Sequence, residues 1–403
     1  MLIVKKFGGT SVGDKDRILN VARRCAEEYA KGNDVVVVLS AMGKTTDILL
    51  QQAKEINPKA PKRELDMLMT TGEQVSVALM SIALHSMGIP SVSLNAFQVS
   101  MQTTSVYGSA RLKKIETERI QREISDRKIV IVTGFQGVNK YGDYTTLGRG
   151  GSDTTAVALA AALHADACEI YTDVDGVYTA DPRIVPGAKK LDEITYDEML
   201  DLATCGAGVL HNRSVEMAKK YGVPLVVRSS LNDSEGTIVK EVVNMERMLI
   251  SGVALDDHAA RISAMGLKDE PGIAFKLFNI LAKNNINVDI ILQSIGREQT
   301  KDISFTVNEE DAEAAIKLIQ DNKERITVKE VTSNTDVAKI SIIGAGMTSN
   351  PGVAAKMFEA LYNVGVNINM ISTSEIRITV LVKRSEGKKA MNAIHEAFFG
   401  NVE

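Results

Sequence analysis

The sequence predicts an α/β sandwich with a mainly parallel sheet, followed by two smaller ferredoxin-like α+β modules. Three observations support this. At 403 residues the chain is longer than a single hydrophobic core usually organises. Short β-branched runs alternate with helical stretches through its first part. A sequence repeat fills its last part.

Six short runs predict the strands of the parallel sheet. Each is apolar at nearly every position, which indicates burial on both faces, as in a parallel sheet covered by helices. The runs are residues 2–7, 35–40, 92–94, 129–135, 169–174 and 225–229. Helices are expected at 17–29, 64–86, 110–124, 153–164 and 208–221. This alternation predicts one domain over residues 1–240.

The C-terminal part contains the repeat. "PGIAFKLFNILAKNNINVDIILQS" begins at Pro271 and "PGVAAKMFEALYNVGVNINMISTS" at Pro351, and nine of the 24 aligned positions are identical. Each copy predicts a βαββα run, which needs one further strand in the ferredoxin-like plan. The first module, 258–332, has that strand at 326–331. The second, 337–403, has no room for one, so we expect the strand at 249–255 to complete it, which nests the first module inside the second.

Composition and charge exclude several classes of protein. With 51 acidic and 47 basic residues the formal charge is −4, which argues against nucleic acid or a membrane surface as partner. Three dispersed cysteines form no CxxC pair, so neither a disulfide framework nor a zinc site is expected. We find no secretion signal and no apolar stretch of about 18 residues. A cytoplasmic protein with a small ligand is the expectation.

Two glycine-rich loops that precede helices suit anion binding. "KFGGTSVG" follows the first predicted strand, and its glycines let successive backbone N–H groups point at an anion, beside the charge of Lys6. In "GRGGSD", Arg149 can hold a carboxylate with two hydrogen bonds, and Gly150 and Gly151 allow close approach. A tight turn explains the first loop equally well. A helix cap explains the second less well.

Three further segments place polar residues at the ends of predicted elements. "SAMGKTTD" lacks the first glycine of a P-loop, and its Thr46 suits ligand binding or helix capping equally. In "TTGEQVS", Glu73 is expected at the start of a long helix, where a carboxylate also favours the helix dipole. "YTDVDGVYTADPR" suits a nucleotide or a plain acidic turn, and its spacing is not that of a calcium loop.

Six motifs in order, ahead of a tandem repeat, resemble the aspartokinases over essentially the whole chain: "KFGGTSVG", "LSAMGKTTD", "TTGEQVS", "TLGRGGSDTTA", "TDVDGVYTADPR" and "GAGVLH". The resemblance implies the amino-acid-kinase fold followed by two ACT modules. It also implies ATP-dependent phosphorylation of the side-chain carboxylate of L-aspartate to 4-phospho-L-aspartate, the first step toward lysine, threonine and methionine. Mg²⁺ held mainly by the nucleotide phosphates is the implied cofactor, with no metal site of the protein's own.

The resemblance further implies roles for individual residues. Lys6 would stabilise the γ-phosphoryl oxygens, and Asp153 would orient Lys6. Glu73 would take the ammonium of aspartate, and Arg149 a carboxylate. The implied sets are Gly8, Gly9, Thr10 and Ser11 for phosphate; Ser40, Thr46, Glu73, Arg149, Gly150 and Ser152 for aspartate; and Thr172, Asp173, Tyr178 and Arg183 for the nucleotide. The chain departs from the family pattern at Gly208 and Asn212, which puts in doubt a lysine contact to the nucleotide from that helix.

ACT modules of this family bind an end-product amino acid at module interfaces, so the resemblance implies inhibition by lysine, threonine or both. The Pro-Gly turns place helix N-termini where an α-carboxylate can dock, although they also serve simply to start helices. The candidates are Asp269, Gly272, Ala274, Asn287, Val288, Asp289 and Gln293 in the first module, and Gly352, Asn367, Ile368 and Glu375 in the second. A homodimer or higher oligomer through the ACT modules is implied, possibly with a shorter subunit that starts near Met245 or Met248.

Three other functions remain as alternatives. A kinase of the same fold that acts on glutamate, acetylglutamate or carbamate is disfavoured by the repeat and by "GRGGSD". A catalytically inactive amino-acid sensor is disfavoured by Lys6, Arg149 and Asp153. A serine hydrolase is suggested by G-x-S-x-G at residues 9–13, but that elbow normally follows more of its fold, and no histidine has a triad context.

Overall fold

The computed structural model describes residues 1–243, 249–295, 300–347 and 350–400. The chain forms two compact units. The N-terminal unit comprises Met1–Tyr178, Lys190–Thr204 and Gly208–Glu246, and the C-terminal unit comprises Thr179–Lys189, Cys205–Ala207 and Arg247–Glu403. Two short segments inside the expected 1–240 domain thus pack with the C-terminal unit instead.

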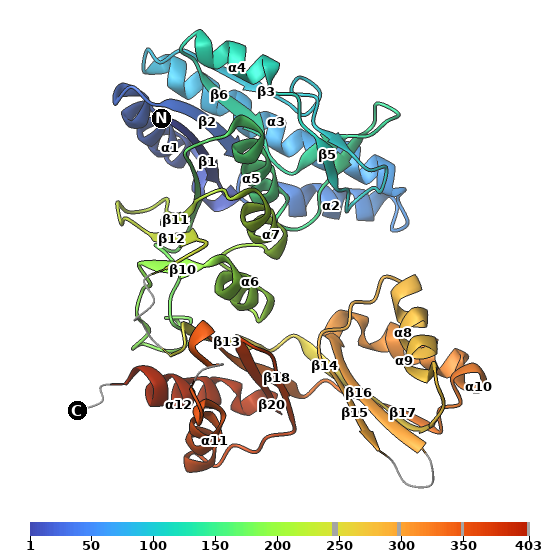
Figure 1. Cartoon of the computed structure of the whole chain (residues 1–403). Coiled ribbons are helices and arrows are strands. Elements are labelled where there is room, and N and C mark those ends of the chain that lie inside the picture. The colour runs from blue at the N-terminus through green and yellow to red at the C-terminus, as the bar shows by residue number, and fades with distance from the viewer. Residues whose placement is uncertain (244–248, 296–299, 348–349, 401–403) are drawn as a thin grey trace. The chain divides into compact units, whose positions relative to one another are not determined.

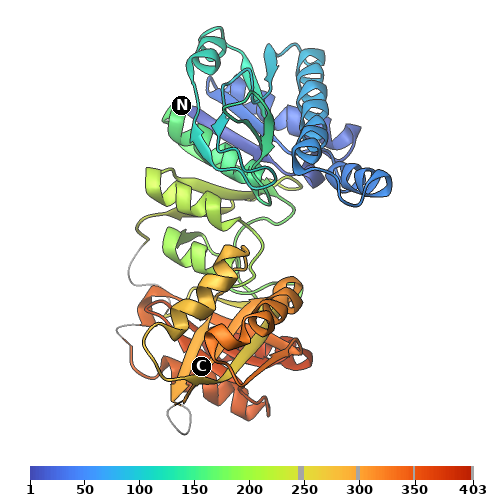
Figure 2. The ribbon, with the colours of Figure 1, turned by 90° about the vertical axis from the view of Figure 1, so that its right-hand side faces the viewer.

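An eight-stranded sheet forms the centre of the N-terminal unit (Figure 1). Its order is β10-β12-β11-β9-β1-β2-β6-β3, in which β11 and β12 are antiparallel and every other pair is parallel. The N-terminal strand β1, blue in Figure 2, lies in the interior of this order. The bounds are β1 Leu2–Phe7, β2 Asp34–Leu39, β3 Ser91–Leu94, β6 Ile129–Thr133, β9 Ala167–Thr172, β10 Glu193–Thr195, β11 Leu225–Ser229 and β12 Thr237–Lys240. The predicted α/β class with a mainly parallel sheet is confirmed.

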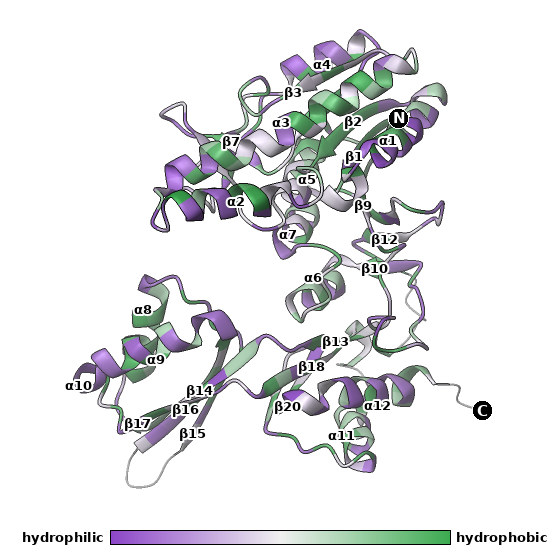
Figure 3. Cartoon of the chain, turned by 180° about the vertical axis from the view of Figure 1, so that it is seen from behind, coloured by the Kyte–Doolittle hydropathy of each residue, from purple (hydrophilic) through white to green (hydrophobic). Residues whose placement is uncertain are grey.

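Helices cover both faces of the large sheet. The bounds are α1 Lys15–Ala30, α2 Thr45–Ile56, α3 Lys62–Ser86, α4 Glu118–Ser125, α5 Gly151–Leu163, α6 Tyr196–Thr204 and α7 Asn212–Tyr221. Alternate residues of β2 and β6, together with Phe7 of β1, pack with α1 and α3 in one buried cluster. Polar side chains of β1 and of the loop after β2 meet α5 on the other face. Burial on both faces explains the continuous apolar run of β2, which is green in Figure 3.

The prediction of a helix over residues 110–124 is wrong in its first half. Leu112–Lys114 forms strand β5, which pairs with β4, Gln102–Thr103, and only Glu118–Ser125 is helical. Together with β7, Gln136–Val138, and β8, Tyr144–Thr146, these strands make a small second sheet that the sequence analysis does not predict. The charged residues in and after β5 have a helical spacing. The backbone groups of β5, however, form hydrogen bonds with β4 and not within a helix.

Helix α3 is longer than expected at its start and is a core helix. It is long and apolar enough to meet a length-and-composition test for a membrane span, contrary to the expectation from sequence. However, 56% of that apolar window is buried inside the structure, and Asp66, Thr70, Glu73 and Ser76 are among its buried residues. These properties are those of a helix that packs within a domain.

The C-terminal unit contains two four-stranded antiparallel sheets, as the repeat predicts. The first has the order β15-β16-β14-β17 and the second β13-β18-β20-β19. The bounds are β13 Gly252–Asp256, β14 Ala259–Lys268, α8 Ile273–Lys283, β15 Ile291–Ile295, β16 Thr300–Asn308, α9 Ala312–Asp321, α10 Lys323–Ile326, β17 Glu330–Asn334, β18 Val337–Ile343, α11 Val353–Asn363, β19 Met370–Thr373, β20 Arg377–Lys383 and α12 Gly387–Phe399. The strand expected at 249–255 is β13, which pairs with β18 of the second module.

The last strand of the first module differs from its expected position. Residues 323–326 form α10, and β17 begins only at Glu330. Thr327, with φ of 50°, ends α10 in the left-handed region, so the chain turns before the strand starts. Compared with the expected strand at 326–331, β17 therefore starts four residues later and ends three residues later.

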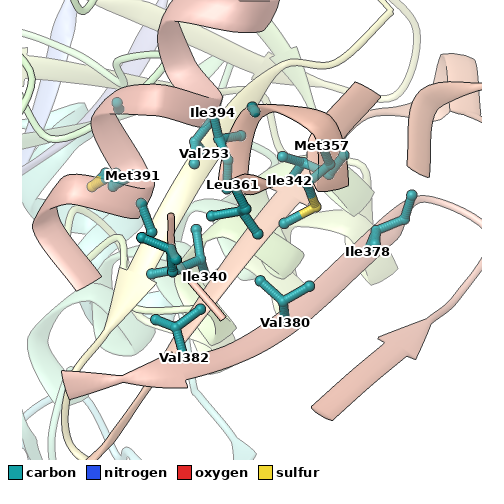
Figure 4. Close-up of a cluster of buried hydrophobic side chains, with 14 of the residues drawn as sticks. Val253, Ile340, Ile342, Met357, Leu361, Ile378, Val380, Val382, Met391 and Ile394 are labelled. Atoms are coloured by element: carbon teal, nitrogen blue, oxygen red, sulfur yellow. The ribbon is translucent and has the colours of Figure 1, made fainter. Parts of the chain in front are cut away.

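Each module has its own apolar core. In the second, Val253, Ile340 and Val380 of the sheet face Leu361 of α11 and Ile394 of α12 (Figure 4). Ala180 and Val185, from the segment Thr179–Lys189, belong to the same buried cluster. The chain between β9 and β10 thus contributes to the core of the second module.

Candidate active site

The predicted catalytic residues gather at the carboxyl-terminal edge of the large sheet. Strands β9, β1 and β2 are parallel neighbours, so the loops that follow them emerge at the same edge. Gly8 follows β1, Ser40 follows β2, and Thr172 ends β9. The first turn of α5 reaches the same place through contacts of Ser152 and Asp153.

Lys6 and Asp153 form the ion pair at the centre of this site. Lys6 Nζ lies 2.6 Å from Asp153 Oδ1, and each side chain is 12% exposed. The first turn of a helix favours the negative charge of Asp153. A Cβ atom at Gly8 would lie 3.6 Å from Lys6 Nζ, so the glycine loop passes close to the ammonium. Asp153 fixes the direction of an ammonium that has further N–H donors for another anion.

The loop after β1 packs tightly against the loop after β2. Gly43 N donates to Gly9 O at 2.9 Å, and a Cβ atom at Gly9 would lie 2.7 Å from Ala41 O. A side chain at position 9 would therefore force the two loops apart. This close approach gives Gly9 a packing role in addition to any contact with phosphate.

Ser11 connects the glycine loop to the segments that follow β11 and end β9. Its hydroxyl donates to Ser230 Oγ at 2.8 Å, and Ser230 N donates to Thr172 O at 2.9 Å. Ser11 is buried, whereas Thr10 is exposed and its carbonyl accepts from Arg17. The side chain of Ser11 is thus engaged in holding two loops together.

Glu73 lies in the middle of α3, so its expected place at the helix start is wrong. Its side chain is buried, Oε1 accepts from Ala41 N at 3.1 Å, and Oε2 has no hydrogen-bond partner among the described residues. Burial raises the pKa of Glu73 to about 7, although its backbone hydrogen bonds act in the opposite direction. A desolvated carboxylate with one oxygen unsatisfied is suited to bind an ammonium group.

Ser40 and Ser152 bring the loop after β2 to the start of α5. Ser40 Oγ donates to Ser152 Oγ at 2.9 Å, and Ser40 O accepts from Ser76 Oγ of α3 at 2.9 Å. Thr46 is in the first turn of α2, which starts after Lys44 with no side-chain cap. Capping therefore does not explain Thr46.

Arg149 is exposed on a turn between two glycines. Gly148 and Gly150 have φ of 79° and 65°, in the left-handed region that glycine tolerates. No residue that the structure describes forms an ion pair with Arg149. A Cβ atom at Gly150 would lie 2.2 Å from His211 Cγ, so the turn rests directly on this histidine. Burial lowers the pKa of His211 and favours its neutral form.

We predict that Gly150→Ala destabilises the N-terminal unit more than Gly222→Ala does. Both positions have positive φ, 65° and 63°, but Gly222 has no atom within 4 Å of its added Cβ. The shared backbone strain costs about 1–2 kcal/mol, and the clash with His211 adds roughly 1–3 kcal/mol at position 150. Chemical unfolding of the two variants measures the difference. Equal losses of stability would contradict this packing of the turn.

The residues of the expected nucleotide loop separate between the two units. Thr172 Oγ1 donates to Asp173 Oδ1 at 3.0 Å in the N-terminal unit, where Tyr178 also lies. Arg183 belongs to the segment Thr179–Lys189 of the C-terminal unit and lies 2.7 Å from Asp181. Thr172, Asp173 and Tyr178 thus belong to one unit and Arg183 to the other, and the role of all four in nucleotide binding stays a prediction.

The two departures from the family pattern lie just before and at the start of α7. Helix α7 begins at Asn212, whose Nδ2 donates to Thr204 Oγ1 at 3.2 Å. Gly208 precedes the helix, contrary to expectation, and a Cβ atom there would meet nothing within 4 Å. Position 208 therefore has room for a longer side chain.

The sequence analysis missed a buried ionic network on the opposite face of β1. Lys5 Nζ lies 2.6 Å from Glu169 Oε2 and 3.5 Å from Glu28 Oε2, and its side chain is 3% exposed. Arg228 Nε lies 3.4 Å from Glu169 Oε1. Burial lowers the pKa of Lys5, but the charge of Glu169 and its neighbours raises it more, so the net shift is upward. Adjacent lysines thus face opposite sides of the sheet, as strand alternation requires.

Phe135 is a second residue that the sequence analysis missed. Its φ of 68° is in the left-handed region, which is rare for a bulky residue and typical of functional sites. Phe135 N donates to Thr155 Oγ1 of α5 at 3.2 Å, and a Cβ atom at Gly151 would lie 2.8 Å from its ring. Phe135 therefore packs against the first turn of α5 and supports it. No signal in a single sequence marks such a backbone conformation.

Comparison with known proteins identifies the family. Residues 1–229 match the model of the amino acid kinase family, and residues 262–322 and 340–398 match an ACT domain model. An aspartokinase from Bacillus sp. (strain MGA3) is 53% identical over 98% of this chain and 97% of its own length. The chain belongs to the aspartokinase family.

Other aspartokinases are similar over the same length. Aspartokinase 2 of Bacillus subtilis is 48% identical over 98% of this chain and 97% of its own. The structure of Escherichia coli aspartokinase III in complex with aspartate and ADP has a TM-score of 0.86 at 26% identity, over 99% of this chain and 100% of that one. The same enzyme in complex with lysine and aspartate gives 0.76 at 27% identity, over 99% of each chain. This aspartokinase is therefore an ATP-dependent phosphotransferase with a carboxylate acceptor, in the amino-acid-kinase fold with ACT modules.

The candidate effector residues of this aspartokinase lie at corresponding places in its two ACT modules. Gly272 and Gly352, with φ of 88° and 97°, are the residues before α8 and α11, so both Pro-Gly turns need glycine. Asp269 forms an ion pair with Lys301 at 2.8 Å, and Asp289 forms one with Lys339 at 2.7 Å. The rest are mostly exposed at the starts of the two helices, in the loops after them or along the following strands: Ala274, Asn287, Val288 and Gln293, and Asn367, Ile368 and Glu375.

Proposed function

We propose that this chain transfers the γ-phosphoryl group of ATP to the side-chain carboxylate of L-aspartate, with Lys6 and Asp153 at the reacting centre. The observation that carries this proposal is the Lys6–Asp153 pair, 2.6 Å apart beside the glycine loop. Phosphoryl transfer needs positioning and neutralisation of charge rather than a covalent nucleophile. An ammonium held by one carboxylate, with donors to spare, supplies both.

The proposed aspartate site uses the groups around Lys6. Glu73 Oε2 binds the substrate ammonium, and exposed Arg149 grips a carboxylate with two parallel hydrogen bonds. Ser40, Thr46, Gly150 and Ser152 complete this site. The phosphates lie over Gly8 to Ser11, and the nucleotide extends toward Thr172, Asp173, Tyr178 and Arg183.

We also propose Mg²⁺ as cofactor, held mainly by the phosphate oxygens of ATP. Among the described residues no group of three histidine, cysteine, aspartate or glutamate side chains could hold a metal ion. The phosphate oxygens of ATP are the hard ligands that Mg²⁺ prefers, so in this proposal the cation arrives with the nucleotide. Mg²⁺ supplies charge neutralisation between the phosphates, and Lys6 adds a fixed charge on the transferred group.

Trapping of the acyl phosphate with hydroxylamine tests the proposed reaction. Purified protein with MgATP, L-aspartate and hydroxylamine is expected to form the coloured hydroxamate, and glutamate in place of aspartate is expected to give none. Absence of hydroxamate from folded protein that still binds lysine or threonine would instead favour the sensor function. Labelling by a serine-directed phosphonate would favour a hydrolase.

We predict that binding of aspartate weakens below about pH 7 because Glu73, whose pKa is raised to about 7, is then protonated. A neutral carboxyl group has no charge to offer the ammonium, so KM for aspartate should rise about tenfold for each pH unit below that value. In Glu73→Gln, KM should be high at every pH and this dependence should disappear. An unchanged pH dependence of KM in Glu73→Gln would assign it to another group.

We further propose feedback inhibition by lysine, threonine or both at the ACT modules, in a homodimer or higher oligomer formed through them. Such regulation couples two sites through their effect on one equilibrium. A shorter subunit that starts at Met245 or Met248 belongs to the same proposal, and both methionines lie outside the described residues. A cytoplasmic location also remains a proposal.

A further inference from the structure

One lysine of the second ACT module is held between two carboxylates. Lys339 of β18 has its Nζ 2.8 Å from Asp256 Oδ2 and 2.7 Å from Asp289 Oδ2. Asp256 is the cross-strand neighbour of Lys339 on β13. Asp289 comes from the first module, in the loop between α8 and β15. The ion pair with Asp289 therefore joins the two modules of one chain.

The environment of Lys339 makes this contact strong. Its side chain is only 10% exposed, and those of Asp256 and Asp289 are 20% and 27% exposed. Beside it, Ile290 of the first module packs with Val337, Met370 and Leu381 of the second in one buried cluster. The ammonium of Lys339 is largely shielded from water, so its charge is poorly screened, whereas the two carboxylates keep more contact with water. Removal of either partner would leave a charge partly buried without its counter-ion.

The repeat shows that this arrangement is specific to one module. Ser341 and Thr379 share a hydrogen bond on β18 and β20, as Ser263 and Ser304 do on β14 and β16. Ser341 of β18 and Ser263 of β14 are therefore equivalent positions in the two modules. Lys339 lies two residues before Ser341, and Arg261 lies two residues before Ser263, so Arg261 is the counterpart of Lys339.

The neighbours of Arg261 carry no charge where those of Lys339 do. Its cross-strand neighbour is Asn334, in the place of Asp256, and the repeat aligns Asn369 with Asp289. Arg261 forms no ion pair with any residue that the structure describes. Two amides thus replace two carboxylates, so the charged clamp exists at only one of the two related positions.

We infer that Lys339 is a built-in competitor for the Asp289 carboxylate, which makes the effector site of the first module selective for amino acids without a cationic side chain. This inference rests on the proposed binding of effectors at the ACT modules. Every free amino acid carries an α-ammonium, so lysine and threonine differ at Asp289 only through their side chains. A side-chain ammonium directed at Asp289 would have to displace Lys339 Nζ or lie beside it, and like charges repel. The hydroxyl side chain of threonine needs no such displacement.

Calorimetric titration of the full-length protein with L-lysine and L-threonine tests this directly. Wild type is expected to bind threonine at the first module and to lack lysine binding there. In Lys339→Gln the freed Asp289 should create one lysine site per chain, or tighten lysine binding at least about tenfold, with threonine affected much less. Adding Asp289→Asn to Lys339→Gln should remove this gain.

Two further variants separate the inference from simple damage to the fold. Lys339→Gln with Asp256→Asn lowers the repulsion between the two remaining carboxylates and should show the same gain for lysine. Arg261→Gln, the matched control in the other module, should show none. A Lys339→Gln protein that still binds threonine but gains no affinity for lysine would overturn the inference. If no variant, wild type included, bound either amino acid, the proposed regulation itself would fail, and this inference with it.

Discussion

Replacement of Lys6 by methionine will lower kcat by at least about 10²–10³-fold while the protein remains folded, because one charge on the transferred phosphoryl group is lost. Methionine keeps the length and apolar stem of lysine but has no N–H donors. The Lys6 side chain is only 12% exposed, so methionine is chosen to preserve the packing of its stem. Steady-state assay of hydroxamate formation at saturating ATP and aspartate measures the effect.

Asp153→Asn provides the companion to this experiment. The amide keeps the shape of Asp153 but withdraws the charge that orients Lys6 at 2.6 Å. Its activity should fall less than that of Lys6→Met, and the double variant should be little worse than Lys6→Met alone, since the two side chains act as one unit. Additive losses in the double variant, or an active Lys6→Met enzyme, would remove Lys6 from the proposed reacting centre.

Replacement of Lys5 by methionine will have the opposite result: a loss of stability of at most about 3–5 kcal/mol, because the buried Glu169 loses its nearest counter-ion and keeps only Arg228, 3.4 Å away. Lys5 is 3% exposed and lies 2.6 Å from Glu169. Activity per folded molecule should change far less than in Lys6→Met. The chain has no tryptophan, so unfolding in urea is best followed by circular dichroism and tyrosine fluorescence.

A second variant distinguishes loss of the ion pair from loss of packing. Lys5→Met with Glu169→Leu removes both charges, and replacement of a whole buried pair by apolar groups is often close to neutral. Stability should therefore recover substantially in the double variant. A Lys5→Met protein as stable as wild type but inactive would mean that Lys5 takes part in the reaction.

Six of the eight strands of the large sheet could be predicted from sequence because each is a continuous apolar run, whereas the short strands β10 and β12 were missed. The runs at 2–7 and 225–229 are β1 and β11 to the residue. The nested second module followed from counting the elements of each repeat copy. The start of α3 was misplaced because Pro61, which precedes its first residue, was not used as a start signal.

The candidate site was predictable only in part. Lys6, Glu73 and Asp153 were predicted from the motifs that resemble the family. The raised pKa of Glu73 could not be predicted, because it depends on burial, which arises only when α3 packs against the sheet. The Lys5–Glu169 pair joins residues 164 positions apart, and no local pattern reports such a contact. Arg183 was assigned by its motif, and no local pattern indicated that its segment, Thr179–Lys189, packs with the C-terminal unit.

The segment Thr179–Lys189 has a consequence for any attempt to divide this chain. Val253 N donates to Thr179 O at 2.8 Å, and Ala180 and Val185 fill part of the second ACT core. A kinase fragment that ends at residue 240 would carry these apolar side chains with nothing to cover them. A regulatory fragment that starts at residue 245, such as the proposed shorter subunit, would lack Ala180 and Val185 and would leave part of this core open for a partner chain to cover. In the full-length chain the segment closes that part of the core from within the same polypeptide.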